Sequence, residues 1–212
     1  MPSLSILLPS FAILVLSLSF HEAAHAWTAN RLGDPTARLL GRLTLNPLAH
    51  IDWIGTVLFP LVAMASHLPI IGWAKPVPVD ARNLREPRRD FAIVALAGPV
   101  SNLILATAAA VALRAVVVAT GRGQATSDPL GPVENVLLLA VIVNVLLAVF
   151  NMIPIPPLDG GNVAIGLLPR PLAVVFARLR PWGFLILYAL MFSGILLWFV
   201  QPVNNAILTW LL

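Results

Sequence analysis

Two histidines and a glutamate lie within five consecutive residues, in the sequence HEAAH that begins at His21. Residues four positions apart lie on the same face of a helix, so the imidazoles of His21 and His25 can reach one tetrahedral metal ion. Glu22 projects from the neighbouring position, where it can take a proton from water without being a metal ligand. This spacing predicts a zinc site, with one Zn2+ per chain, and a general base beside it.

The hydrophobic surroundings of these residues strengthen that interpretation. Residues 4–28 are long enough to cross a bilayer, and they contain no other ionisable side chain. Ionisable groups at membrane depth are costly, and those that occur there are usually functional. The alternative is a chance occurrence of the pattern, in which both histidines are satisfied by hydrogen bonds to their neighbours.

Two histidines leave a zinc ion short of protein ligands, so the chain must supply a third. It contains no cysteine, and His50 and His67 flank a broken hydrophobic run, where loop or core roles account for them. Most acidic residues lie among basic loop residues, while Asp128 and Glu134 are expected on the opposite side of the membrane. Asp159 remains, and we predict that it is the third ligand.

The segment around Asp159 suits a ligand that enters the site from another helix. Three prolines between positions 154 and 157 cannot continue a helix, so the chain must leave α geometry near membrane depth. Gly160 and Gly161, directly after the aspartate, permit unusual backbone angles. The alternative is a simple helix end, with Asp159 as the N-cap of the next helix.

The composition is that of a membrane protein. The 212 residues are 59% hydrophobic and 10% charged, with a mean hydropathy of +0.91. Soluble domains carry about 25% charged residues, so we predict an all-α polytopic membrane protein built as a transmembrane helix bundle. The net charge is +4. In a membrane protein, an excess of basic residues more plausibly sets the orientation of the chain in the membrane than binds nucleic acid.

Hydrophobic runs and basic residues together predict a topology. Four runs are long enough to cross a hydrocarbon core of about 30 Å, approximately 4–28, 91–119, 133–156 and 182–200. Basic residues cluster after the first run, before the second and between the last two, which predicts an N-terminus outside and a cytoplasmic location for those segments. The shorter run 53–72 is interrupted by prolines, and both of its flanks are then cytoplasmic. We predict a re-entrant element there; a true crossing is the alternative.

Smaller elements are expected around the spans. Residues 41–47 alternate polar and apolar side chains, and the prolines of 73–79 permit only an edge strand, so we predict a small membrane-associated β element between the first two long spans. Either strand would hold a substrate in extended form by edge pairing. Residues 161–180 predict an interfacial cytoplasmic helix. The chain 1–212 is predicted to be one domain, with a core of about 4–165.

Three motifs together resemble the site-2 protease family of intramembrane zinc metalloproteases, peptidase family M50. They are HEAAH at 21–25, AGPVSN at 97–102 and NMIPIPPLDGG at 151–161. The resemblance extends over roughly residues 15–165. We expect a compact form of that family, without the PDZ or CBS domain that many members carry.

The resemblance implies roles for individual residues. In that family the two histidines and the aspartate of the LDG motif bind zinc, and the glutamate activates water. These roles fall on His21, His25, Asp159 and Glu22. The family's remaining motif asparagines correspond to Asn151 and Asn102, which are expected to contact the substrate or the oxyanion. Asn151 also stands out by itself, because a buried amide near Asp159 can donate a hydrogen bond to a developing oxyanion.

The expected function is that of an intramembrane zinc endopeptidase. It would hydrolyse peptide bonds in or near the transmembrane segments of single-span membrane proteins, as in regulated intramembrane proteolysis, from a multi-pass position in the cell membrane. The active site would lie toward the cytoplasmic side. The alternative is a membrane zinc-binding or transport protein without hydrolysis, which would use the same ligands but would not need Glu22.

Overall fold

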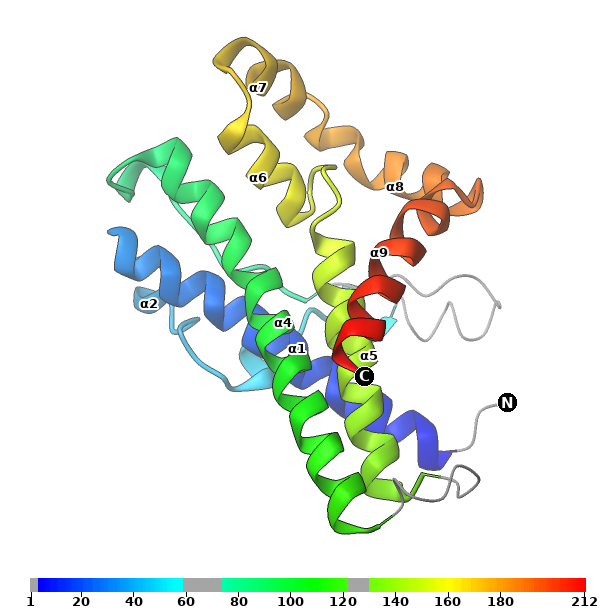
Figure 1. Ribbon diagram of the computed structural model, residues 1–212. Coiled ribbons are helices and arrows are strands. Elements are labelled where there is room, and N and C mark those ends of the chain that lie inside the picture. Colours follow the sequence, from blue (N-terminus) through cyan, green and yellow to red (C-terminus); the bar gives the residue numbers. More distant parts are fainter. Residues whose placement is uncertain (1–3, 59–73, 122–129) are drawn as a thin grey trace.

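The described residues form a helical bundle without β-strands. The computed structural model describes residues 4–58, 74–121 and 130–212, and all regular structure within these ranges is helical (Figure 1). The long helices are α1 (Leu4–Leu32), α4 (Pro87–Ala119) and α5 (Pro132–Asn151). Proline stands in the first turn of both α4 and α5, a position where its missing N–H costs no helical hydrogen bond.

Shorter helices connect the long ones and complete the C-terminal half. The α-helices among them are α2 (Thr36–Leu39), α6 (Asp159–Leu167), α7 (Arg170–Ala177), α8 (Gly183–Phe192) and α9 (Ile195–Leu211). Single turns are η1 (Pro47–Ala49), η2 (Trp53–Leu58), η3 (Ala81–Asn83) and η5 (Arg180–Trp182). The N-terminal part of α4 packs between α1 and α6, and its remainder packs against α5.

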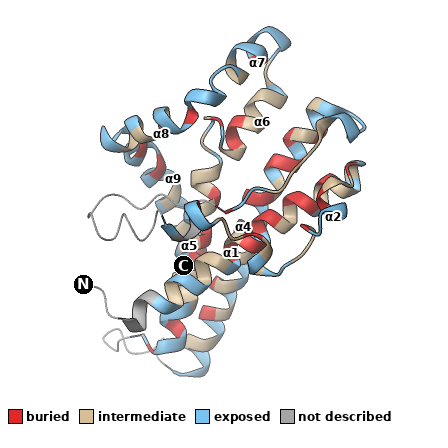
Figure 2. Ribbon diagram, turned by 180° about the vertical axis from the view of Figure 1, so that it is seen from behind, coloured by how far each residue is buried: buried red, intermediate tan, exposed pale blue. Residues whose placement is uncertain are grey.

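Small residues on α4 bring the helices of the core close together. Ala106 and Ala110 of α4 pack against Val141 and Val145 of α5, and Leu211 of α9 covers the same cluster. Small side chains at such contacts let helix backbones approach closely, which is how helices associate in lipid. Buried residues are concentrated on α1, α4, α5 and α6 (Figure 2). The motif residues His21, Glu22, His25 and Asn102 are among these buried residues.

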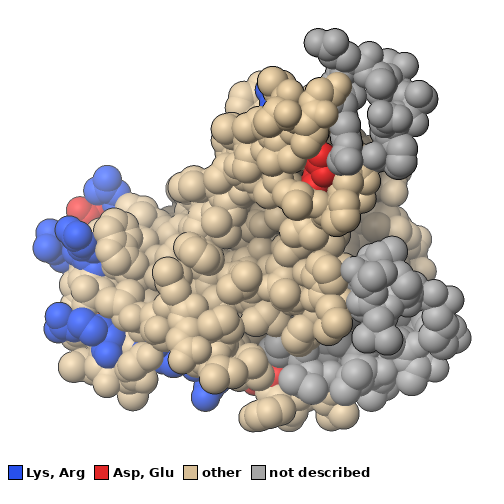
Figure 3. Space-filling model, turned by 90° about the horizontal axis from the view of Figure 1, so that it is seen from below, with Lys and Arg blue, Asp and Glu red and all other residues tan. Residues whose placement is uncertain are grey.

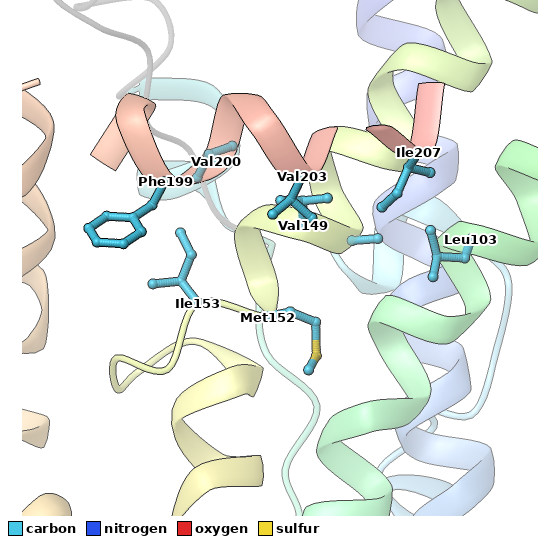
Figure 4. Close-up of a pocket in the computed structure, with 9 residues that line it drawn as sticks. Leu103, Val149, Met152, Ile153, Phe199, Val200, Val203 and Ile207 are labelled. Atoms are coloured by element: carbon cyan, nitrogen blue, oxygen red, sulfur yellow. The ribbon is translucent and has the colours of Figure 1, made fainter. Parts of the chain in front are cut away.

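An apolar cavity lies between α9 and the α4–α5 pair. Its volume is about 280 Å³, and its walls come from α4, α5, the turn after α5 and α9 (Figure 4). The lining residues are Leu103, Ala148, Val149, Met152, Ile153, Phe199, Val200, Val203 and Ile207. No polar side chain lines it, so this cavity is not a place for hydrolytic chemistry.

Three segments of the described chain are long and apolar enough to cross a membrane. They are Pro87–Ala119, Pro132–Asn151 and Arg170–Phe192. The predicted span over 182–200 is wrong as a single helix, because the chain breaks between α8 and α9. Gly194, at that break, has a φ of 76°, a left-handed conformation that ends a helix.

The predicted helix over 161–180 is also divided. It consists of α6 and α7, which are separated by an extended Leu168 and by Pro169. A residue before proline is driven out of the α region, so this break follows from the sequence.

The prediction of a small β element is wrong for the described residues. Residues 41–46 form turns, bends and irregular loop, Pro47 begins η1, and the described part of 73–79 (from Ala74 on) has no ladder partner. Pro76 and Pro78 have no N–H to donate, while the N–H groups of Lys75 and Val77 bond to loop and side-chain oxygens. The predicted re-entrant run 53–72 lies mostly outside the described residues, which include only its first turn, η2.

Candidate metal centre

Three predicted ligands meet at one point of the bundle. The Nε2 atoms of His21 and His25 lie 3.0 Å and 3.4 Å from Oδ2 of Asp159, although α1 and the start of α6 are far apart in the sequence. Among the described residues, these three form the only cluster of His, Asp or Glu with metal-ligand spacing. His50 lies elsewhere, where its Nε2 donates to the Thr44 carbonyl.

Hydrogen bonds on the far side of each ring fix which nitrogen faces the cluster. His25 Nδ1 lies 2.7 Å from the Val94 carbonyl, which only accepts, so Nδ1 carries the proton. His21 Nδ1 lies 2.6 Å from Oδ1 of Asn102. The Nδ2 group of Asn102 donates to Oδ1 of Asn144 at 2.9 Å, which sets the orientation of the amide. With Nδ1 protonated in this way, both rings turn Nε2 toward Asp159 and can offer it as a ligand lone pair.

This arrangement fits a cation. Oδ2 of Asp159 is buried and accepts no hydrogen bond in the described structure. Two imidazole lone pairs facing a carboxylate oxygen at 3.0 Å and 3.4 Å repel each other unless a positive charge lies among them. Ligands at zinc bond lengths in a tetrahedron stand about 3.3 Å apart, so the observed spacing suits zinc with little adjustment.

Glycines allow the ligands to come this close. A Cβ added at Gly98 of α4 would lie 2.5 Å from Nε2 of both histidines, so only glycine lets α4 pass the two rings. A Cβ at Gly160 would collide with the Met152 carbonyl, which lies beneath the first turn of α6. Asp159 is the first residue of α6 and makes no capping hydrogen bond, so the alternative role as an N-cap does not hold.

The carboxylate of Glu22 lies beside the three ligands and does not join them. It is 8% exposed, and its Oε2 accepts a hydrogen bond of 2.8 Å from the N–H of Val77. This bond leaves Oε1 as the oxygen that can accept a proton from a reactant. The position agrees with the expected separation of ligands and base.

A cavity of about 380 Å³ opens next to these groups. Its size is that of a small-molecule or peptide site. Its walls come from α1, α4, α5, α6, α8 and the segment 74–79. The residues that line it are Leu18, His21, Glu22, His25, Ala74, Pro76, Val77, Val79, Phe91, Val94, Ala95, Leu147, Phe150, Asn151, Pro157, Leu158, Asp159, Asn162, Phe184 and Leu187.

The two motif asparagines occupy different positions. Asn151 lines the cavity, but its Nδ2 donates to the Leu147 carbonyl of its own helix at 2.9 Å. Asn102 is 0% exposed and does not line the cavity. In this arrangement the amide of Asn102 is engaged by His21 and Asn144, and a contact between Asn102 and the substrate stays a prediction.

Sequence reasoning missed several partners of the site. The carbonyl of Val94 and the N–H of Val77 are backbone groups. Every residue has a carbonyl and nearly every residue an N–H, so the residue type does not indicate these contacts. Asn144 belongs to none of the three motifs, and its contact with Asn102 links it to His21. A buried asparagine on each of two adjacent spans was the one signal that could have suggested that link.

Comparison with known proteins gives consistent matches. Residues 115–194 match the family described as Peptidase family M50. The chain is 34% identical over 201 residues to "Putative zinc metalloprotease YwhC" of Bacillus subtilis (strain 168), with 94% of this chain and 88% of the relative covered. It is 33% identical over 195 residues to "Putative zinc metalloprotease Rip2" of Mycolicibacterium smegmatis, with 89% and 69% covered. No solved structure matches the chain.

Proposed function

The chain belongs to peptidase family M50, the family of the site-2 proteases, and from this membership we propose that it is an intramembrane zinc endopeptidase that cuts membrane proteins in or near their transmembrane segments. The observation that carries the proposal is the meeting of His21, His25 and Asp159 beside Glu22 between long apolar helices. Burying ionisable side chains at membrane depth costs free energy, and the residues that occur there are usually functional.

His21, His25 and Asp159 would hold one zinc ion per chain. When bound in such a three-ligand site, zinc acts as a Lewis acid and lowers the pKa of a coordinated water toward about 7. The chain's own contribution is to keep three lone pairs directed at one point. The hydrogen bonds that the two Nδ1–H groups donate to Oδ1 of Asn102 and to the Val94 carbonyl provide that direction.

Glu22 is the proposed general base and acid. Its Oε1 takes a proton from the attacking water, and the same carboxyl group later gives the proton to the amine of the leaving peptide. The hydrogen bond from Val77 to Oε2 fixes the carboxylate while this happens. Among the described residues that line the cavity, Glu22 is the one acidic side chain outside the ligand cluster.

Asn151 is the proposed contact of the scissile carbonyl. It lies on the cavity wall near the ligand cluster, and its amide can donate to a developing oxyanion once Nδ2 leaves the Leu147 carbonyl. A helical substrate hides its carbonyls in backbone hydrogen bonds, so it must be extended to react. The cavity walls are largely apolar, which suits the side chains of a transmembrane segment.

The proposed orientation has the N-terminus outside and the active site toward the cytoplasm. Lys and Arg side chains gather at one side of the molecule, whereas the rest of the visible described face has almost none (Figure 3). His21 lies 11 residues before the end of α1 at Leu32, about 16 Å from that end of the helix. The site would thus be inside the membrane, near its cytoplasmic side.

The proposed substrates are single-span membrane proteins. The test is to purify wild type and Glu22→Gln, to measure zinc content, and to follow cleavage of a panel of single-span proteins. We expect cleavage by the wild type only, with equal zinc in both proteins. Chelation should abolish cleavage, and added zinc should restore it. A Glu22→Gln protein that cleaves at the wild-type rate would overturn the proposal and favour zinc binding or transport.

A further inference from the structure

An extended segment lines the cavity and contacts the proposed general base. We define this segment, Ala74–Asp80, as the strap. Four of its residues line the cavity, among them Val77, whose N–H donates to Oε2 of Glu22 at 2.8 Å. Prolines at 76 and 78 hold the residues before them in extended conformations, so the strap is stiff for its length.

The strap is attached to the rest of the protein at both ends. At its start, a guanidinium nitrogen of Arg42 donates to the Lys75 carbonyl at 2.6 Å and to the Pro76 carbonyl at 3.4 Å. The N–H of Lys75 donates to the His50 carbonyl at 2.8 Å. At its end, the N–H of Asp80 donates to Oδ2 of Asp34 at 2.7 Å. The two carbonyls held by Arg42 lie directly before Val77.

Arg42 is in an unusual environment for a cation. Arg42 is only 8% exposed. No acidic group among the described residues lies within ion-pair distance of its guanidinium. A buried guanidinium always remains charged, so it needs acceptors, and here it uses backbone carbonyls of the strap. A cation buried against two consecutive carbonyls holds that stretch of backbone in one position.

We propose that Arg42 is a positioning residue for the proposed reaction. It holds the strap at residues 75 and 76, and the strap in turn keeps the Val77 N–H on the carboxylate of Glu22. Arg42 touches neither the ligands nor the cavity, so its action is entirely through the backbone. The inference rests on the proposed function, because it assigns a role to Glu22 in catalysis.

The first test measures the link itself and does not depend on proteolysis. Pro76 and Pro78 have no exchangeable amide. Hydrogen exchange of a peptide covering the strap therefore reports on few amides, and the amide of Val77 is one of them. We expect exchange in this peptide to accelerate in Arg42→Gln and in Glu22→Ala. Arg88→Gln is the matched control, because Arg88 binds a backbone carbonyl, that of Ile165, away from the strap. Unchanged exchange in Arg42→Gln would overturn the inference.

The second test uses kinetics with one cleaved single-span protein. Arg42→Gln should lower kcat by about 10- to 100-fold, with KM changed less than about threefold and zinc content unchanged, because the base is misplaced and the ligands are not. Arg42→Lys should recover part of the loss. Val77→Pro removes the N–H and should reproduce the loss of kcat, whereas Arg88→Gln leaves the strap untouched and should not.

Combining the changes decides whether Arg42 acts through Val77. The double variant Arg42→Gln/Val77→Pro should be no slower than the slower single variant, because both changes break the same connection. Three results would contradict the positioning role. They are losses of kcat that multiply in the double variant, a loss of zinc in Arg42→Gln, and a loss of kcat in Arg42→Gln equal to that in Arg88→Gln. If no protein is cleaved although exchange responds as expected, the proposed function fails and the structural link stands.

Discussion

Nδ1 of His21 lies 2.6 Å from Oδ1 of Asn102, and this contact crosses from α1 to α4 at the centre of the bundle. Asn102 then donates to Asn144 of α5, so one chain of hydrogen bonds joins a candidate ligand to two other helices. Buried amides of this kind both stabilise helix packing and fix the tautomer of the histidine.

The first prediction concerns this chain of hydrogen bonds. Asn102→Ala should weaken zinc binding by about 10- to 100-fold, because His21 loses the partner that directs its ring. Asn144→Ala should weaken it less, since the contact between His21 and Asn102 survives. Competition with a zinc chelator measures both affinities. Equal effects of the two variants would show that the amides serve helix packing alone.

Gly98 provides a test of how tightly α4 passes the ligands. An added Cβ would lie 2.5 Å from Nε2 of both histidines, so Gly98→Ala should displace the rings and abolish zinc binding. Alanine in a helix interior is favoured over glycine by about 1 kcal/mol, which opposes any general unfolding. We expect a folded protein without zinc, measured by metal analysis and by circular dichroism. A variant with normal zinc content would contradict the packing described here.

The candidate ligand set could be assigned from the sequence because membrane depth makes polar residues informative. His21, Glu22 and His25 were assigned from their spacing, and Asp159 from the absence of cysteine and the poor placement of other candidates. The structure brings the three expected ligands together. The hydrophobic segments contain few ionisable side chains, so few residues could be the third ligand. The third ligand can therefore be assigned although it is far from the two histidines in the sequence.

The errors came from features that side-chain patterns do not determine. The alternation of residues 41–47 resembles a strand, but a strand needs a partner, and prolines at 76 and 78 remove the donors that the other segment would offer. The break between α8 and α9 depends on one glycine, Gly194, inside an otherwise hydrophobic run. Hydropathy alone treats such a run as continuous.

Asn151 gives a prediction that separates chemistry from packing. If its amide stabilises the oxyanion, Asn151→Ala should lower kcat by about 100-fold or more, with little change in KM or zinc content. The present bond from Nδ2 to Leu147 must then break during the reaction. Kinetics on a single-span substrate measure this, with Asn162→Ala on the cavity wall as the control. A loss below about fivefold would remove Asn151 from the mechanism.

The last prediction uses Asp34, which follows α1 and is 0% exposed. Burial alone would raise the pKa of this carboxyl, but hydrogen bonds from Thr36, from Asn83 and from the N–H of Asp80 together hold the pKa below its ordinary value. A carboxyl with a lowered pKa in the folded state stabilises the protein above its ordinary pKa. That stabilisation is lost as the pH falls through the folded value.

Asp34→Asn should therefore destabilise the protein by about 1–3 kcal/mol at neutral pH, because a buried acceptor for the Asp80 N–H is lost. As the pH falls toward the acid range, the wild type should lose stability and the difference between the two proteins should shrink. Thermal unfolding in detergent from pH 7 to below the ordinary pKa of an aspartate measures this, because the difference changes only where Asp34 takes up its proton. Glu86→Gln is the control, because Glu86 lies on the surface and pairs weakly with Arg89. A constant difference at every pH would mean that Asp34 contributes through packing and not through its charge.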